Sequence, residues 1–94
     1  MASPVEDIKA RLSATELIGR DVRLQRSGRY MKGLCPFHTE KTPSFFVFED
    51  RDTFRCFGCG EGGDIFTYIL RRDGCEFPDA LKLLAAEAGI ELTV

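Results

Sequence analysis

Hydrophobic residues recur at helical spacing near both ends of this 94-residue chain and at strand spacing in its middle. At the N-terminus, Ser3 can cap a helix that begins with Pro4. Apolar positions follow at helical intervals, at Val5, Ile8 and Leu12. The pattern predicts an N-terminal helix that buries this side.

Capping signals and apolar stripes predict three more helices. Residues 13–19 open with a capping box and end at a glycine. Residues 64–74 begin with Asp64, carry an apolar stripe, and end with two arginines and a glycine. The last helix is expected to start at Pro78 and to stop at Gly89. Its apolar side consists of Leu81, Leu84, Ala85 and Ala88.

The middle of the chain reads as two hairpins. Val22 and Leu24 alternate with polar residues and are followed by a Ser-Gly turn signal, so a returning strand is predicted over 29–34. Residues 44–48 and 53–56 surround a polar turn and predict the second hairpin. The expected fold class is therefore α+β, with a small antiparallel β-sheet flanked by N- and C-terminal helices.

Length bounds the organisation of the chain. We expect one domain over residues 1–94. No apolar run approaches the ~20 residues needed to cross a membrane, so membrane contact is not expected. A core of this size is modest, and small domains often supplement it with a metal ion.

Four metal-ligand side chains stand in two close pairs, in the pattern C-x2-H-x17-C-x2-C. They are Cys35, His38, Cys56 and Cys59. Each pair can place two ligands on one tight turn, and three cysteines with one histidine suit a closed structural Zn2+ site. The hairpins would deliver the ligands from their tips, as in a zinc ribbon. The glycines expected to direct N–H groups at thiolate sulfur are Gly60, Gly62 and Gly63.

Other uses of cysteine fit less well. A redox CxxC leaves Cys35 and His38 unexplained, and the N-terminus lacks the signal-peptide pattern expected with disulfides. Free thiols used as ligands imply a reducing compartment, so we expect a cytoplasmic location. Zinc can contribute on the order of 10 kcal/mol to folding, so the metal is expected to be required. Cys75 has no ligand-spaced partner and is expected to be an ordinary semi-buried thiol.

Charge is unevenly distributed, although the net charge is only −2. Residues 20–41 hold six basic and two acidic side chains, whereas residues 42–94 hold five basic and ten acidic ones. This asymmetry is weak support for a polyanion-binding face. Solvated surface charge is the commoner explanation for any single cation, but phosphate contact is the better one for a cluster beside the zinc turns. The cluster is expected to comprise Arg29, Lys32, Lys41 and Arg55.

Aromatic residues alternate along one predicted strand. Phe45 and Val47 point to one face, and Phe46 and Phe48 to the other. We expect one face to meet the helices and the other to be partly open, so that single-stranded bases stack on Phe46 and Tyr30. The alternative, in which helices cover both faces, stays open at this point.

The run from Tyr30 to Phe45, Y-M-K-G-L-C-P-F-H-T-E-K-T-P-S-F, with C-F-G-C-G at 56–60, resembles the N-terminal zinc-binding domain of bacterial DNA primase. The resemblance covers nearly the whole chain. It implies one structural zinc on the four ligands named above, recognition of single-stranded template DNA, and support of RNA primer synthesis. The polymerising chemistry would belong to a separate magnesium-dependent domain C-terminal to it, with a helicase-binding domain beyond.

This resemblance implies three partners: a single-stranded DNA template, a primase catalytic domain in cis or in trans, and the replicative helicase through the full-length protein. The chain departs from the family at Phe46, where a small polar residue is expected, and at Arg55, where many relatives carry histidine. Template preference therefore does not carry over.

We expect the chain to be non-catalytic by itself, because its one histidine is a ligand and its acidic residues form no Mg2+ cluster. An alternative function is a protein-interaction module that docks on a primase or polymerase catalytic core with little DNA affinity. A second is a thiol switch in which oxidation releases zinc.

Overall fold

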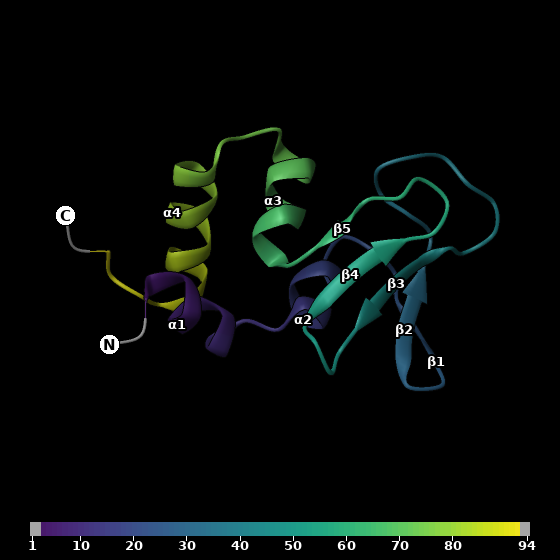
Figure 1. The fold of residues 1–94 in the computed structure, drawn as a ribbon, viewed down its shortest axis with the longest axis horizontal. Helices are drawn as coiled ribbons and strands as arrows, with labels where there is room; N and C mark the ends of the chain where they lie inside the picture. Colours follow the sequence, from purple (N-terminus) through teal and green to yellow (C-terminus); the bar gives the residue numbers. More distant parts are fainter. Residues whose placement is uncertain (1–2, 93–94) are drawn as a thin grey trace.

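The computed structural model describes residues 3–92, with a five-stranded sheet at one end, the first and last helices at the other, and the two remaining helices between them (Figure 1). The helices are α1 (Pro4–Arg11), α2 (Ala14–Gly19), α3 (Ile65–Asp73) and α4 (Phe77–Ala88). The strands are β1 (Gln25–Ser27), β2 (Tyr30–Gly33), β3 (Phe45–Phe48), β4 (Thr53–Cys56) and β5 (Gly62–Gly63). All neighbouring strands are antiparallel and follow chain order. The predicted α+β fold is confirmed.

Local capping sets the limits of the helices, as predicted. The hydroxyls of Ser3 and Ser13 and the carboxylate of Asp64 each accept the N–H of the residue three positions later, at 3.0–3.2 Å. Gly74 and Gly89 end α3 and α4 with φ of 63° and 71°, a left-handed conformation that glycine adopts without steric cost. Within residues 3–92, no helix combines the length and apolar character needed to span a bilayer.

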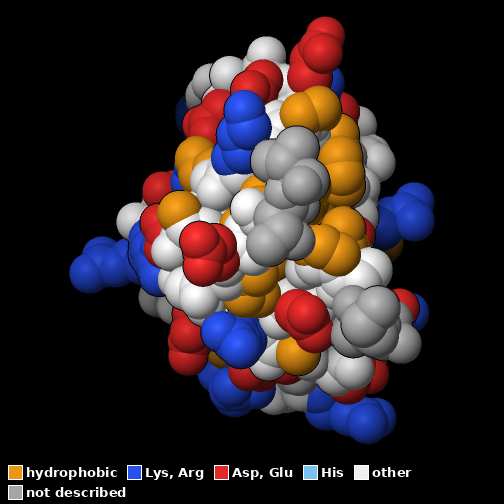
Figure 2. Space-filling model, turned by 90° about the vertical axis from the view of Figure 1, so that its left-hand side faces the viewer, with side chains coloured by type: hydrophobic (Ala, Val, Ile, Leu, Met, Phe, Trp, Pro, Cys, Tyr) orange, Lys and Arg blue, Asp and Glu red, His pale blue; other side chains and the backbone are white. Residues whose placement is uncertain are grey.

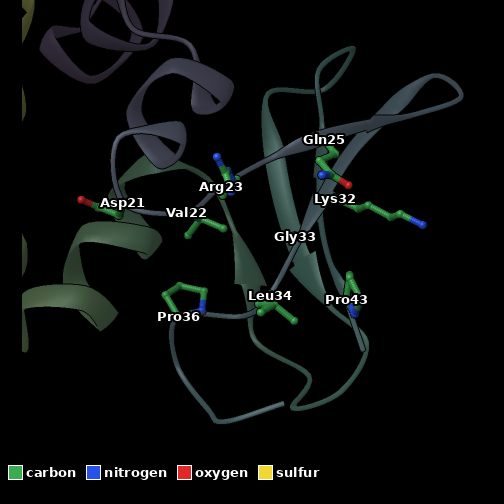
Figure 3. Close-up of a pocket in the computed structure, with 9 residues that line it drawn as sticks. All are labelled: Asp21, Val22, Arg23, Gln25, Lys32, Gly33, Leu34, Pro36 and Pro43. Atoms are coloured by element: carbon green, nitrogen blue, oxygen red, sulfur yellow. The ribbon is translucent and has the colours of Figure 1, made fainter. Parts of the chain in front are cut away.

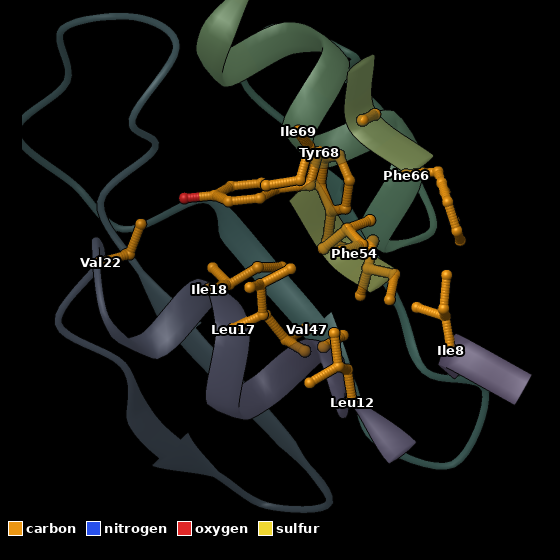
Figure 4. Packing of buried hydrophobic residues seen from close by; sticks show 14 of the residues in the cluster. Ile8, Leu12, Leu17, Ile18, Val22, Val47, Phe54, Phe66, Tyr68 and Ile69 are labelled. Atoms are coloured by element: carbon orange, nitrogen blue, oxygen red, sulfur yellow. The ribbon is translucent and has the colours of Figure 1, made fainter. Parts of the chain in front are cut away.

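The inner face of the sheet packs against α2 and α3. Phe45, Val47 and Phe54 on this face are at most 2% exposed. The Phe54 ring centroid lies 5.4 Å from that of Phe45 and 5.7 Å from that of Tyr68 in α3. Figure 4 shows Val47 and Phe54 among side chains of both helices, including Ile18. This face is the one predicted to meet the helices.

The first strand begins later than predicted. Val22 and Leu24 precede β1, whose pairing with β2 starts only at Gln25. The Val22 N–H donates to the Ile18 carbonyl at 2.9 Å, so the chain completes a turn after α2 while the Val22 side chain enters the core. The alternation of apolar residues here reflects burial beside a helix rather than strand pairing.

A fifth strand was not predicted, because Gly62–Gly63 has no side chains that could show a period. Gly62 pairs with Arg55, and Gly63 pairs with Phe54. A Cβ on Gly62 would lie 3.0 Å from the Phe54 carbonyl oxygen, so this close pairing favours glycine. β5 returns the chain from the second ligand turn to α3.

Candidate metal centre and the adjacent sheet face

Two loops bring the predicted zinc ligands together at one end of the sheet. Cys35 and His38 lie in the loop after β2, whereas Cys56 ends β4 and Cys59 lies in the turn before β5. The last residues of β2 and β4 both pair with Phe45, so the sheet register places the two loops beside each other. The four ligand atoms all lie within 4.8 Å of one another.

Distances within the cluster fit a tetrahedral zinc ion. The sulfur atoms of Cys35 and Cys59 are 3.8 Å apart, and Cys56 Sγ lies 3.9 Å from His38 Nδ1. A tetrahedron with Zn–S bonds of about 2.3 Å has edges of about 3.8 Å. These residues would hold one four-coordinate Zn2+ that joins the two loops and leaves no position for a reactive water.

Backbone N–H groups approach sulfur, but not from the glycines predicted. In each pair the residue two positions after the first cysteine donates to that cysteine's sulfur, at 3.3 Å and 3.4 Å; the second donor is Gly58. The Gly60 N–H donates instead to the Cys56 carbonyl at 2.8 Å, and Gly62 and Gly63 form β5. The prediction for Gly60, Gly62 and Gly63 was therefore wrong, because these glycines serve the turn and the strand.

The two buried thiols differ in acidity. Burial raises the pKa of the Cys35 thiol to about 12. Burial also disfavours the Cys56 thiolate, but hydrogen bonds from backbone N–H groups, including that of Gly58, hold the pKa of this thiol below its ordinary value. Zinc binding must therefore displace a proton from Cys35, whereas Cys56 more readily offers a thiolate.

His38 divides its two ring nitrogens between the cluster and a carboxylate. Nδ1 faces the Cys56 sulfur, and Nε2 lies 3.1 Å from Glu40 Oε1. A Cβ on Gly58 would lie 2.9 Å from Nε2, so the ring packs directly against the second ligand turn. Glu40 was not singled out from the sequence. The available signal was an acidic residue two positions after a histidine ligand.

Three of the expected nucleic-acid contacts form one row across the outer face of the sheet. Lys32 of β2 pairs with Phe46 of β3, which pairs with Arg55 of β4. Paired residues of antiparallel strands point to the same side, here away from the helices. Tyr30 lies on this face two residues before Lys32, with its ring centroid 4.9 Å from that of Phe48. The partly open face predicted for Phe46 and Phe48 is present, since both are only partly buried.

The other two expected cations lie outside this row. Arg29 is in the turn between β1 and β2, at the end of that hairpin away from the zinc ligands. Lys41 is exposed in the loop between His38 and β3. The four cations therefore do not form one compact cluster, because the hairpin carries Arg29 to the opposite end of the sheet.

Two cation–aromatic contacts extend the outer face. The Arg55 guanidinium lies 5.5 Å from the ring centroid of Phe57, and that of Arg51 lies 5.0 Å from the centroid of Phe48. Phe57 is 63% exposed, with its centroid 5.6 Å from that of Phe46. Neither Arg51 nor Phe57 was predicted from the sequence to contact nucleic acid. The position of Phe57 between two metal ligands was a signal for it, whereas Arg51 had none.

Carboxylates neutralise other arginines but not the cations of the row. Arg20, Arg26 and Arg71 each have a carboxylate oxygen within 2.8 Å. Over residues 3–92, neither Lys32 nor Arg55 takes part in an ion pair. The outer face therefore keeps positive charge that can attract an anion.

A recess of about 350 Å³ continues the row at the β1 edge (Figure 3). Gln25 pairs with Lys32 in register, and both line the recess. Its apolar wall includes Leu34, which is 49% exposed, together with Val22 and Pro43. An apolar recess with a few polar groups at its border is the usual form of a small-ligand site.

Comparison with known proteins agrees with this geometry. A family model described as CHC2 zinc finger matches residues 1–94. A DNA primase of Geobacillus stearothermophilus is 48% identical over 96% of this chain and 15% of its own length. A DNA primase of Mycolicibacterium smegmatis is 44% identical over 92% of this chain and 14% of its own length. The chain thus spans about a seventh of these curated relatives.

A solved structure matches the fold as well. The crystal structure of the Aquifex aeolicus primase, with its zinc binding and RNA polymerase domains, aligns with a TM-score of 0.91 at 30% identity. The alignment covers 99% of this chain and 23% of that one. One structural Zn2+ is the cofactor that the family and the ligand cluster support. The chain belongs to the CHC2 zinc finger family, and its Cys-His-Cys-Cys set is formed by Cys35, His38, Cys56 and Cys59.

Proposed function

We propose that this chain is the template-binding part of a DNA primase and supports RNA primer synthesis by binding single-stranded DNA. The observation that carries the proposal is the row Lys32–Phe46–Arg55 beside the zinc loops, which sets an aromatic ring between two cations that have no carboxylate partner among residues 3–92. Bases stack on aromatic rings while phosphates pair with nearby cations, in a manner that tolerates different sequences.

The spacing of the row suits a single strand. Lys32 and Arg55 are two strands apart, about 10 Å at the usual interstrand spacing. One base can lie on Phe46 while its flanking phosphates approach the two cations. Tyr30, Arg29 and Lys41 would make further contacts along the hairpin and the ligand loop. The recess beside Lys32 gives a neighbouring base an apolar wall.

Fluorescence anisotropy with a short labelled single strand tests this proposal. Wild-type protein should bind weakly, with an affinity that falls as salt rises. The double variant Lys32→Ala, Arg55→Ala should lose affinity and flatten the salt slope by about 1.4, roughly 0.7 for each lost phosphate contact. Phe46→Ala should weaken binding about 5- to 150-fold, the equivalent of ~1–3 kcal/mol for one stacked base.

A charge-matched control separates a binding face from general charge. Arg20→Ala, Arg26→Ala removes the same two charges, but both arginines are paired with carboxylates. This variant should keep near wild-type affinity. Equal losses in the two double variants would count against a specific face. Indifference to Arg29→Ala with Lys32→Ala would also count against it, since both cations are proposed phosphate contacts.

A second candidate function is docking on a primase or polymerase catalytic part, in cis or in trans, with the replicative helicase reached through the full-length protein. Apolar side chains gather among charges on the end formed by α1 and α4 (Figure 2). Leu81 and Leu83 of α4 and Ile90, which follows this helix, are only partly buried. A pull-down with a catalytic domain, repeated without DNA, tests it. Tight capture combined with no DNA affinity would favour docking as the main role.

A further inference from the structure

One carboxylate connects the backbone and side chains of the first ligand loop. Glu40 is 10% exposed. Its Oε2 accepts the N–H of Cys35 at 2.8 Å and that of Ser44 at 3.1 Å. Its Oε1 accepts the Ser44 hydroxyl and lies 3.1 Å from His38 Nε2. Three hydrogen-bond donors and the imidazole Nε2 therefore surround two oxygen atoms, which together can accept about four hydrogen bonds.

These contacts reach three of the four zinc ligands. The Glu40 carboxylate contacts the backbone N–H of Cys35 and the imidazole ring of His38. It reaches Cys56 through the Ser44 hydroxyl oxygen, which lies 3.5 Å from the Cys56 sulfur. Only Cys59, the exposed ligand of the set, has no such connection among residues 3–92. The carboxylate thus ties the first ligand loop to the end of β4.

The ring of His38 gives the carboxylate a chemical role. A neutral imidazole carries a proton on one nitrogen and a lone pair on the other. An Nε2–H that donates to Glu40 leaves the lone pair on Nδ1, and Nδ1 is the nitrogen that faces the sulfur atoms. Carboxylates that accept from a ligating histidine fix its tautomer and ring orientation.

We propose that Glu40 is a positioning residue of the zinc site. It holds His38 as the Nε2–H tautomer with Nδ1 directed at the metal, and it holds the Cys35 turn in place before zinc arrives. Two simpler explanations cover less of the geometry. A surface ion pair does not explain the low exposure or the two backbone donors, and a loop cap does not explain the contact with the histidine ring.

Nuclear magnetic resonance reads the tautomer directly, because His38 is the only histidine in the chain. In zinc-loaded wild-type protein, long-range 1H–15N spectra should show a metal-bound Nδ1 and a protonated Nε2 whose proton exchanges slowly with water. Zinc bound through Nε2 would overturn the proposal without any variant being made.

Variants then test the carboxylate itself, with zinc affinity measured by chelator competition. Glu40→Gln keeps the size but turns one oxygen into a donor, so it cannot satisfy all four contacts. We expect this variant and Glu40→Ala to bind zinc about 10- to 100-fold more weakly. When saturated with zinc, Glu40→Ala should also show fast exchange of the Nε2 proton. Glu40→Asp, which keeps the charge, should recover part of the affinity.

Glu61→Gln is the matched control. Glu61 carries the same charge near the second ligand turn, but its carboxylate pairs with Arg71 at 2.8 Å rather than with a ligand. Its zinc affinity should stay within about 2-fold of wild type, far from the 10- to 100-fold loss expected of an outer-shell partner. Equal losses in Glu40→Gln and Glu61→Gln would show a general charge effect and overturn the assignment. If Glu40→Ala does not fold, Glu40→Gln and the wild-type spectrum decide.

Discussion

At the scale of single residues, two glycines stand where neighbouring atoms leave no room for a side chain. A Cβ on Gly33 would lie 2.7 Å from the Arg23 carbonyl oxygen and 3.0 Å from Val22 Cγ1. A Cβ on Gly58 would lie 2.8 Å from the Ser44 hydroxyl oxygen. Neither glycine is needed for a left-handed backbone, so close approach of the chain is what excludes a side chain at both.

Gly33→Ala is predicted to destabilise the protein. The nearest atom belongs to the backbone, so the segment that leads into β1 must move, at a cost of ~1–3 kcal/mol. Denaturant unfolding of the zinc-loaded protein measures this. Gly19→Ala is the control, because its Cβ would meet only Leu24 at 3.9 Å near the end of a helix. It should be neutral or stabilising by up to ~1 kcal/mol, and equal losses at the two positions would contradict the packing argument.

At the scale of elements, Asp64 joins two helices that are far apart in sequence. Its Oδ1 caps α3 by accepting the Thr67 N–H at 3.0 Å, and its Oδ2 lies 2.6 Å from Lys9 Nζ in α1. Burial by itself would raise the pKa of this carboxyl. Hydrogen bonds from Lys9 and Thr67 outweigh that effect and hold the pKa below its ordinary value.

Asp64→Ala should therefore cost ~0.5–2 kcal/mol in unfolding free energy at neutral pH. A depressed carboxyl pKa stabilises the fold above the unfolded-state value and loses that contribution as pH falls through the lower folded-state value. The difference in unfolding free energy between wild type and Asp64→Ala should stay constant from pH 7 down to about 5 and shrink only below about 4. Denaturant unfolding at pH 7 and pH 5.5 checks the upper part of this range, where zinc stays bound most readily.

Glu76→Ala is a suitable control for this element, since Glu76 occupies the N-cap of α4 without a side-chain hydrogen bond there. It should cost less than the substitution at Asp64. A loss at Asp64 that grows as pH falls from 7 to 5 would mean that folding raises the pKa of this carboxyl instead of lowering it.

At the scale of the whole molecule, one ion would hold together the end of the sheet opposite the β1–β2 turn. Residues 34–44 form no helix or strand. This loop contributes two ligands to the cluster, Cys35 and His38, and near its end the Ser44 hydroxyl oxygen lies 3.5 Å from the sulfur of a third, Cys56. Structural zinc contributes apparent energies on the order of 10 kcal/mol, comparable to the whole stability of a small domain.

Chelation of zinc under reducing conditions is accordingly predicted to unfold the sheet. Amide protection in β2 to β5 should be lost in hydrogen exchange. The helices should lose stability too, because Phe45 and Phe54 of the sheet pack with Tyr68 of α3 in one core. Readdition of zinc should restore protection. A chelated, reduced protein that melts as sharply and at the same temperature as the zinc-loaded one would contradict a required metal.

Much of this architecture could be predicted from short stretches of sequence. Three helix starts were predicted from Ser3, Ser13 and Asp64, because a capping side chain bonds to an N–H only three residues later. The zinc ligands were predicted from two close pairs, because the two ligands of a pair lie on one tight turn of the chain. The alternation of side chains along a single strand was enough to predict that Phe45 and Phe46 point to opposite faces of the sheet.

Tertiary structure decided what depends on partners distant in the chain. Val22 joined the core instead of a strand because α2 and the sheet enclose it, and β5 formed from glycines because β4 offered an edge. Strand register placed Lys32, Phe46 and Arg55 in one row and carried Arg29 away from it. The fold also turned Glu40 toward His38 and Cys35. Helix caps, turns and ligand pairs depend on residues that are adjacent in the chain, so the sequence determines them. Strand register and the meeting of distant side chains arise only when separate segments pack together.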